Sequence, residues 1–97
     1  MADLNDLIHQ PVRLRIMAAL SSLDSREQVD FSFLKDKLGL TDGNLGAHLR
    51  ALEDASYILV EKTFVERRPK TFVSVSAAGR KAFAAHVAAL QSILKPQ

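Results

Sequence analysis

The stretch LTDGNLGAHLRALEDASYI, residues 40–58, has the pattern of an amphipathic helix. Leu45, Leu49 and Leu52 recur at helical spacing and form one apolar stripe, which predicts a face buried in a core. Half a turn away, at about 100° per residue, lies a face with almost no side-chain bulk near its start, formed by Gly43, Gly46, Ala47 and Arg50. Each helical glycine costs about 0.5 to 1 kcal/mol relative to alanine. The bare face therefore predicts either close approach of a partner or packing beneath a neighbouring helix.

Two further helices are predicted before this one. The first begins at Pro11, a residue that suits the first helical position, and it carries apolar residues at helical spacing: Val12, Ile16, Ala19, Leu20 and Leu23. Asp30 is a good N-cap for a short second helix, which ends at the natural left-handed C-cap Gly39 after the apolar residues Phe31, Leu34 and Leu38. Thr41 can cap the third helix, which runs to about Ala55, so only about two residues separate the second and third helices, as in a helix-turn-helix.

A β-hairpin and a final helix are predicted after residue 56. The segment YILVEKTFVERRPKTFVSVS, residues 57–76, is rich in β-branched and aromatic residues, which favours strands. Pro69 lacks a donor and favours extended geometry at Arg68, so the turn is expected near Glu66 to Pro69, with two arginines at or beside its tip. From Ser76 an alanine-rich helix is expected to run to about Leu94.

This order of elements resembles a known domain family. The segment FSFLKDKLGLTDGNLGAHLRALEDASYILVEKTFVERRPKTFVSVSAAGRKAF is similar to the winged-helix DNA-binding domain of small bacterial and archaeal transcriptional regulators related to the MarR and ArsR types. The parts LGLTDGNLGAHLRALEDA and TFVSVSAAGRKAF carry most of the resemblance. It implies an α+β, mainly α, winged helix-turn-helix in one domain over residues 1–97, with a dimer that lays the third helix in the major groove and sends the hairpin wing toward the backbone or minor groove.

The chain departs from the family pattern at two places. Ser56 stands where the family usually has glycine, and left-handed geometry at serine would cost about 1 to 2 kcal/mol. A slightly altered turn is therefore expected there. Ala77 and Ala78 replace residues that tend to be charged, so the last helix has no capping box.

The predicted DNA contacts come from the third helix and the wing. Small residues allow close approach to phosphates or base edges, while Thr41, Asn44 and Arg50 supply hydrogen bonds. The wing cations would add salt-sensitive affinity rather than base identity, and keeping the hairpin tip soluble is their alternative role. His48 is either a phosphate donor or a partly buried structural residue. The full predicted set is Thr41, Gly43, Asn44, Ala47, His48, Arg50, Lys62, Arg67, Arg68 and Lys70.

An apolar seam along the last helix predicts a homodimer. Phe83, Val87, Leu90 and Leu94 follow steps of 4, 3 and 4 residues, the spacing of a helix that packs on another helix. A domain of 97 residues has a small core and often gains stability from a second subunit. The seam, with help from Leu4, Leu7 and Ile8, is expected to cross a two-fold axis. Packing on the first helix of the same subunit is the alternative.

Composition excludes several other classes of protein. The chain has no cysteine, and its three histidines, His9, His48 and His86, lie far apart in sequence, so neither a metal site nor another cofactor is expected. No catalytic motif appears, and an enzyme is not expected. The acidic start MADLNDLIHQ is unlike a signal peptide, and no apolar run reaches the roughly 18 residues of a membrane span. A cytoplasmic protein without membrane contact is expected, and the sequence specifies no small-molecule effector.

Charge is distributed unevenly along the chain. Residues 1–56 carry 6 Lys and Arg against 9 Asp and Glu, whereas residues 57–97 carry 7 against 2. The late positive charge lies at Lys62, Arg67, Arg68, Lys70, Arg80 and Lys81. Such asymmetry is typical either of a surface that meets the phosphates of double-stranded DNA or of plain solvated surface. The acidic residues Asp42, Glu53 and Asp54 support an alternative, a winged-helix module that binds another protein.

Overall fold

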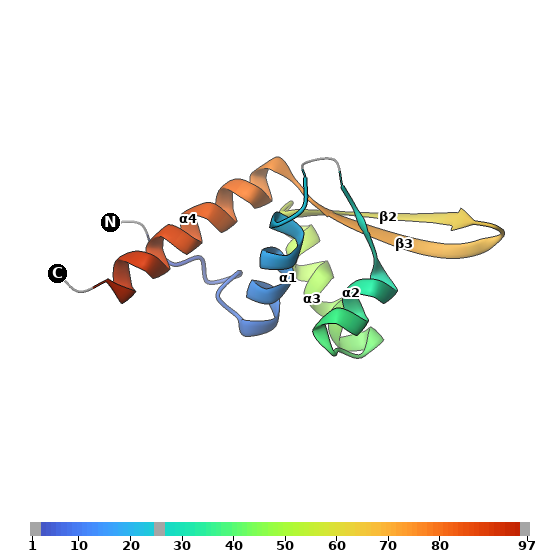
Figure 1. Ribbon diagram of the computed structural model, residues 1–97, viewed down its shortest axis with the longest axis horizontal. Coiled ribbons are helices and arrows are strands. Elements are labelled where there is room, and N and C mark those ends of the chain that lie inside the picture. Colours follow the sequence, from blue (N-terminus) through green and yellow to red (C-terminus); the bar gives the residue numbers. More distant parts are fainter. Residues whose placement is uncertain (1–2, 25–26, 96–97) are drawn as a thin grey trace.

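The hairpin and the last helix project from opposite ends of a three-helix centre (Figure 1). The computed structural model describes residues 3–24 and 27–95, and the chain measures 56 × 25 × 21 Å along its principal axes. The elements in chain order are α1 (Pro11–Ser21), β1 (Val29–Asp30), α2 (Phe31–Leu38), α3 (Asp42–Asp54), β2 (Ile58–Val65), β3 (Arg68–Val75) and α4 (Ala77–Leu94). The predicted mainly helical α+β fold is confirmed.

The helix boundaries follow the predicted caps. Pro11 occupies the start of α1, and the side chains of Asp30 and Thr41 accept hydrogen bonds from backbone N–H groups in the first turns of α2 and α3. Gly39 ends α2 in the left-handed conformation, with φ of 66°. Three residues, 39–41, separate α2 from α3, one more than the expected spacing. These local hydrogen bonds fix the helix-turn-helix.

Ser76 caps α4 without a capping box, as its side chain accepts a hydrogen bond from Gly79 N–H. Ser56, in the turn before β2, adopts the left-handed conformation that glycine favours, with φ of 65°. The expectation of an altered turn was wrong. This conformation is energetically unfavourable for serine. A hydrogen bond from the Ser76 hydroxyl to the Ser56 carbonyl oxygen, at 2.7 Å, stabilises the turn.

The sheet has three antiparallel strands in the order β1-β3-β2. The short strand β1 was not predicted from the sequence, and it pairs Val29 with Val73. The hairpin turn is tighter than predicted, since Val65 pairs with Arg68 and only two residues, Glu66 and Arg67, form the turn with positive φ. Such a two-residue turn matches the right-handed twist of the two strands.

The core lies where α1, α2 and α3 meet the sheet. The predicted leucine stripe of α3 is buried, as Leu45 and Leu52 are fully buried and Leu49 nearly so. The other buried hydrophobic residues are Ile8, Ile16, Met17, Leu20, Leu34, Leu38, Ile58, Val73, Val75 and Ala89. Over residues 3–24 and 27–95, no helix combines the length and apolar character needed to cross a membrane.

The start of α4 approaches the backbone of Tyr57 closely. A Cβ atom added at Gly79 would collide with the Tyr57 carbonyl group and approach the Val75 side chain to 3.0 Å. The same carbonyl oxygen accepts a hydrogen bond from Ser76 N–H at 3.0 Å. Glycine at this position therefore allows α4 to dock on the end of the sheet.

Gly79→Ala is expected to destabilise the fold by about 2 to 3 kcal/mol, because overpacking against backbone cannot be relieved by a rotamer change. Chemical denaturation measures the loss. Gly43→Ala is the matched control, since a Cβ at Gly43 would meet no atom within 4 Å. The control should gain about 0.5 to 1 kcal/mol. Equal stability of the two variants would contradict this account of Gly79.

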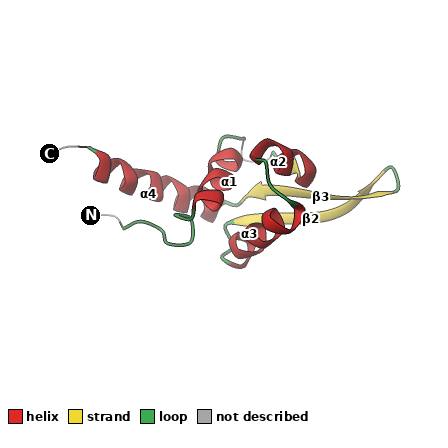
Figure 2. Cartoon of the chain, turned by 90° about the horizontal axis from the view of Figure 1, so that it is seen from below, coloured by secondary structure: helices red, strands yellow, loops and turns green. Residues whose placement is uncertain are grey.

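The N-terminal segment is held against α4 by the buried His86, and the two run alongside each other in Figures 1 and 2. Asn5 N–H donates to His86 Nδ1 at 2.9 Å, so the neutral ring carries its hydrogen on Nε2. This nitrogen lies 3.4 Å from His9 Nδ1. The Asn5 side chain also donates to the Tyr57 hydroxyl at 3.0 Å. These contacts connect the N-terminal segment to both α4 and the sheet.

The stability of the fold is expected to fall as the medium is acidified. Burial, and then the nearby charge of His9, lower the pKa of His86 below its ordinary value of 6.5. The unfolded chain therefore takes up its proton first, so stability is complete above about pH 6.5 and is lost as pH falls toward the lower folded pKa. Melting temperatures between about pH 7.5 and pH 5 measure the effect.

His86→Gln is the control for this pH dependence, because glutamine can accept the Asn5 hydrogen bond but does not titrate in this range. Its melting temperature should depend less on pH than that of the parent. Part of the dependence should remain, since burial also lowers the pKa of His48. A parent and variant with equal pH dependence would exclude His86 as the cause.

Candidate nucleic-acid interface

The bare face of α3 is exposed. A Cβ atom added at Gly43 or Gly46 would meet no atom within 4 Å, so neither glycine packs beneath another helix. The packing alternative raised by the sequence is therefore wrong. Gly43, Ala47 and Arg50 are all exposed, on the side of α3 opposite its buried leucines. This side of the helix is open to a partner.

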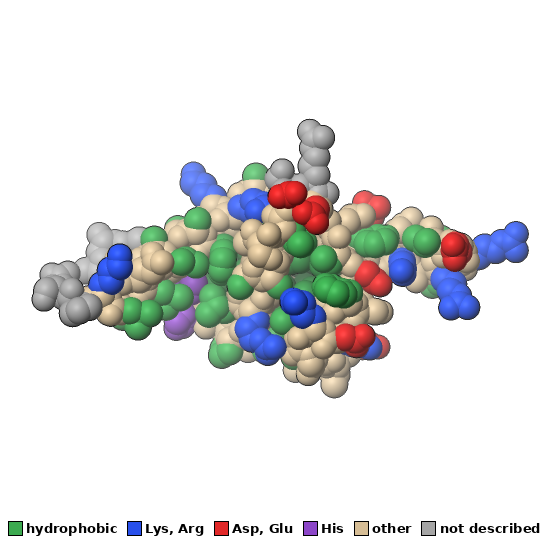
Figure 3. Space-filling model, viewed as in Figure 1, with side chains coloured by type: hydrophobic (Ala, Val, Ile, Leu, Met, Phe, Trp, Pro, Cys, Tyr) green, Lys and Arg blue, Asp and Glu red, His purple; other side chains and the backbone are tan. Residues whose placement is uncertain are grey.

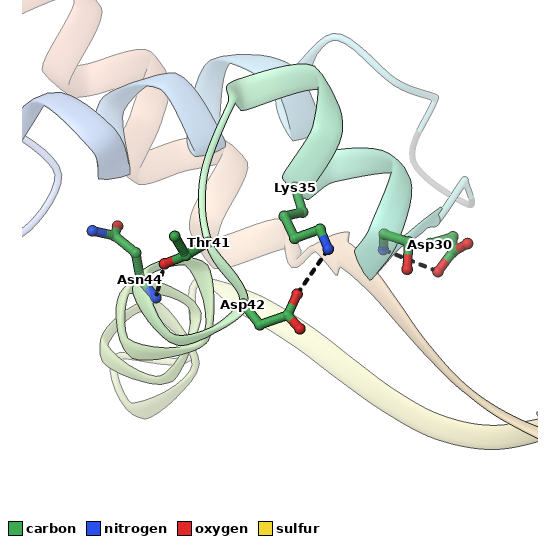
Figure 4. A network of polar contacts seen from close by, with 6 residues as sticks. Asp30, Lys35, Thr41, Asp42 and Asn44 are labelled. Carbon is green, nitrogen blue, oxygen red and sulfur yellow. Dashed lines mark hydrogen bonds and ion pairs between the residues drawn. The ribbon is translucent and has the colours of Figure 1, made fainter.

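An ion pair neutralises the acidic residue at the start of α3. Lys35 Nζ on α2 lies 3.0 Å from the Asp42 carboxylate (Figure 4). The hydrogen bond that Lys35 donates to Asp42, and then the charge of Asp42, raise the pKa of Lys35. The contact offsets the repulsion that Asp42 alone would exert on a phosphate. It also joins the two helices of the helix-turn-helix.

Thr41 and Asn44 lie beside this ion pair at the first turn of α3. The Thr41 hydroxyl oxygen accepts a hydrogen bond from Asn44 N–H at 3.1 Å, so Thr41 is primarily a cap. The Asn44 side chain points away from the Lys35–Asp42 pair in Figure 4. Because both residues are exposed, the Asn44 amide and the Thr41 hydroxyl proton remain available at the helix start.

His48 is engaged inside the chain. Arg13 Nε on α1 donates to His48 Nδ1 at 3.2 Å. Burial, and then the charge of Arg13, lower the pKa of His48, so the neutral ring is favoured. The contact supports the structural role of His48 and leaves Nε2 as its donor. Arg13 was missed in the sequence because it lies 35 residues away from its partner.

A groove separates α3 from the wing, the hairpin formed by β2 and β3. It encloses about 230 Å³. Its walls are formed by Phe31, Gly46, Leu49, Arg50, Glu53, Val60, Lys62 and Thr71. The groove places Arg50 on one side and Lys62 on the other, so two predicted DNA contacts from different elements face one concavity.

The late cations divide into structural and exposed groups. Arg80 donates to the carbonyl groups of Ser21 and Leu23, which ties α4 to the end of α1. Lys70 Nζ lies 3.6 Å from the Asp30 carboxylate, but its side chain stays 45% exposed, so this is a weak surface ion pair. The exposed group comprises Lys62, Arg67, Arg68, Lys70 and Lys81. Lys and Arg side chains gather at the wing tip in Figure 3.

The predicted dimer residues differ in exposure. Ile8 is fully buried within the subunit and has no surface with which to contact a second copy, so its assignment to an interface is corrected. Half-buried residues of the set are Leu4, Leu7, Phe83, Val87 and Leu90. Leu94 is 77% exposed, and its neighbour Ile93, which the seam did not include, is 61% exposed. The end of α4 thus presents apolar surface.

The His9–His86 contact is the only place where two of the three histidines meet within residues 3–24 and 27–95. Sequence reasoning missed it because the residues are 77 positions apart. Across the same described ranges, no group of three or more His, Cys, Asp or Glu residues is suited to hold a metal ion. Because Asn5 N–H donates to His86 and His9 contacts the same ring, the pair packs the N-terminal segment against α4.

Comparisons with known proteins agree with this geometry. Residues 12–94 match the winged helix DNA-binding domain family. An uncharacterised protein of Methanocaldococcus jannaschii is 39% identical over 77 residues, which are 79% of this chain and 80% of that protein. The structure of a transcriptional regulator homologue from Pyrococcus horikoshii OT3 superposes with a TM-score of 0.82 at 31% identity, covering 91% of this chain and 84% of that one.

Two more distant structures share the fold. NadR in complex with 4-hydroxyphenylacetate gives a TM-score of 0.67 at 20% identity, covering 90% of this chain and 62% of that one. The protein smu.1704 from Streptococcus mutans UA159 gives 0.62 at 15% identity, covering 82% and 78%. The helix-turn-helix, the wing and the match over residues 12–94 place the chain in the winged helix DNA-binding domain family.

Proposed function

We propose that the chain is a sequence-specific DNA-binding transcriptional regulator that acts as a homodimer. In this arrangement α3 enters the major groove, and the wing contacts the backbone or minor groove. The observation that carries the proposal is the groove lined by Gly46 and Arg50 of α3 on one side and by Lys62 of the wing on the other. Membership of the family and similarity to a transcriptional regulator homologue support the same function.

The two elements have different tasks in this proposal. Arg50, Asn44 and Thr41 hydrogen-bond base edges or phosphates, since Gly43 and Ala47 let the helix approach the groove floor. Arg67, Arg68 and Lys62 contact phosphates and contribute affinity that is common to all sequences. Lys70, which is exposed on β3 beside Asp30, is a further phosphate contact in this proposal.

Dimerisation completes the proposed site. The apolar end of α4 projects on the side of the molecule opposite the wing (Figure 1), so two copies joined there leave both α3 helices free. A two-fold dimer then presents two recognition helices to successive major grooves, whose half-site centres are about 34 to 36 Å apart. The proposed interface comprises Leu4, Leu7, Phe83, Val87, Leu90 and Leu94. It also includes Ile93, because this neighbour of Leu94 is 61% exposed.

The experiment that tests DNA binding is a titration of duplex DNA at several salt concentrations. Release of condensed counterions predicts that affinity falls steeply as salt rises, with a slope of about 0.9 per neutralised phosphate in a double-logarithmic plot. Absence of binding at low salt, or affinity without dependence on salt, would contradict the function.

Replacing Arg67 and Arg68 with alanine is expected to lower affinity for all duplexes similarly. The salt slope should become shallower by about one to two units, because one to two phosphate contacts are lost. Lys81→Ala is the control, since Lys81 is an exposed cation on α4, away from the wing. An unchanged salt slope in the double variant would show that the wing arginines do not contact phosphates.

A further inference from the structure

An exposed apolar pair lies at the far end of the wing. Phe64 is 73% exposed although it belongs to a strand, and it pairs across the hairpin with the exposed Pro69. Only one residue pair, Val65 with Arg68, separates them from the turn. The Phe64 ring therefore lies far from the hydrophobic core. At this position it contributes little to the stability of the fold.

The strand register places this pair on the face of the wing that carries the groove residues. Alternate residues of a strand share a face, and residues paired across strands lie on the same side. Phe64 thus shares a face with Lys62 and Val60, both of which line the groove opposite α3. Val65 is on the other face. The aromatic ring is an extension of the proposed DNA-binding surface.

Positive charge surrounds this apolar pair. Arg67 and Arg68 lie at the tip between Phe64 and Pro69, with Arg68 paired to Val65, and Lys62 precedes Phe64 on the same face. Glu66 is the acidic residue of the turn, beside Arg67. An apolar ring framed by cations is complementary to the DNA minor groove, where phosphates line the walls and stacked bases form the floor.

We infer that Phe64 is an apolar wedge that enters between adjacent base pairs from the minor groove. Pro69 supports the ring from the paired strand, and the tip arginines hold the neighbouring phosphates. Partial unstacking then kinks the duplex toward the major groove, by about 20 to 90° for wedges of this kind. This inference rests on the proposed DNA-binding function and assigns the wing a part in reading DNA beyond its charge.

The wedge gives the wing a sequence preference without hydrogen bonds to bases. Pyrimidine–purine steps such as TA and CA/TG are the most easily unstacked, so they resist insertion least. The preferred site should carry such a step where each wing lies, in addition to the bases read by α3. Replacing that step with AA should weaken parent binding severalfold.

A second copy of the chain fits this surface less well than DNA does. Two wings packed through Phe64 would bring the tip arginines of both copies close together, and like charges repel. The apolar end of α4, at the other end of the molecule, lies away from these cations. Charge complementarity therefore favours the polyanionic duplex.

The probe for the test is the duplex that the parent protein enriches from a pool with randomised sequence. The fluorescent adenine analogue 2-aminopurine, whose emission rises when the base is unstacked, is placed at the pyrimidine–purine step under the wing. The DNA bend is measured separately, from the gel mobility of circularly permuted fragments. The parent should raise 2-aminopurine fluorescence severalfold and bend the duplex. Phe64→Ala should lose most of both effects, whereas Phe64→Leu should keep part of them.

Val65→Ala is the matched control, because Val65 is the neighbouring exposed apolar residue on the opposite face. It should behave as the parent. The wedge is contradicted if Phe64→Ala bends DNA and raises fluorescence as the parent does, and in that case DNA binding itself still stands. It is also contradicted if Phe64→Ala instead lowers the mass in solution, which would identify a protein interface. Failure of the parent to enrich any duplex would overturn both the wedge and the proposed function.

Discussion

Leu94→Asp should convert the protein from a dimer to a monomer and lower its affinity for a two-part DNA site by about 100-fold or more, because linked half-sites gain this much from effective concentration. Leu94 is 77% exposed in the isolated subunit, so its replacement leaves the monomer core intact. Across a dimer seam, the carboxylate would be buried without a partner, which is strongly unfavourable. Sedimentation measures the mass, and a DNA titration measures the affinity.

Two further variants separate dimerisation from folding. Ser92→Asp introduces the same charge on the opposite side of α4, at 100° per residue, and should remain a dimer. Leu90→Asp should also dissociate the dimer, although Leu90 is half-buried and its replacement also strains the subunit. A folded Leu94→Asp protein that stays a dimer would exclude this seam, and a monomeric parent at micromolar concentration would exclude the dimer.

Arg50→Ala is expected to lower affinity for the preferred duplex by about 5- to 150-fold, which corresponds to 1 to 3 kcal/mol for a base contact by arginine. Arg50 is exposed beside the bare face of α3, so its truncation removes no core contact. Binding to unrelated duplexes should fall much less, and discrimination at one base pair should relax. Asn44→Ala should act in the same direction.

Circular dichroism and thermal melting should show that Arg50→Ala keeps the parent fold. Lys81→Ala changes charge by the same amount on α4 and should leave specific affinity nearly unchanged. If Arg50→Ala and Asn44→Ala both bind the preferred duplex as tightly as the parent, α3 is not the element that reads the sequence.

The helices were predictable because their signals are local. Asp30, Gly39 and Thr41 mark the ends of α2 and α3 through hydrogen bonds and backbone geometry within a few residues. The strand β1 carries no such signal. It exists because Val29 meets Val73 on a strand that lies more than 40 residues later. A strand of two residues is too short to show the alternation of apolar and polar residues from which strands are predicted.

The candidate site was predictable in its residue types and less so in their roles. The open space beside Gly43 and Gly46 excludes packing beneath a neighbouring helix, an alternative that spacing alone left open. Arg80 counted as surface charge in the sequence, but it donates hydrogen bonds to carbonyl groups at the end of α1. Ile8 was assigned to the interface because it is hydrophobic, but it lies in the core of the subunit. Hydrophobicity alone does not distinguish a residue buried in the core from one buried in an interface.

Selection of duplexes from a pool with randomised sequence tests the central claim most directly. A dimer with α3 in the major groove should enrich two inverted half-sites whose centres are about 10 to 10.5 base pairs apart, or a multiple of this spacing. The complex should contain two chains per duplex. Failure to enrich any sequence, or enrichment of one unrepeated half-site bound by a single chain, would contradict the proposed regulator.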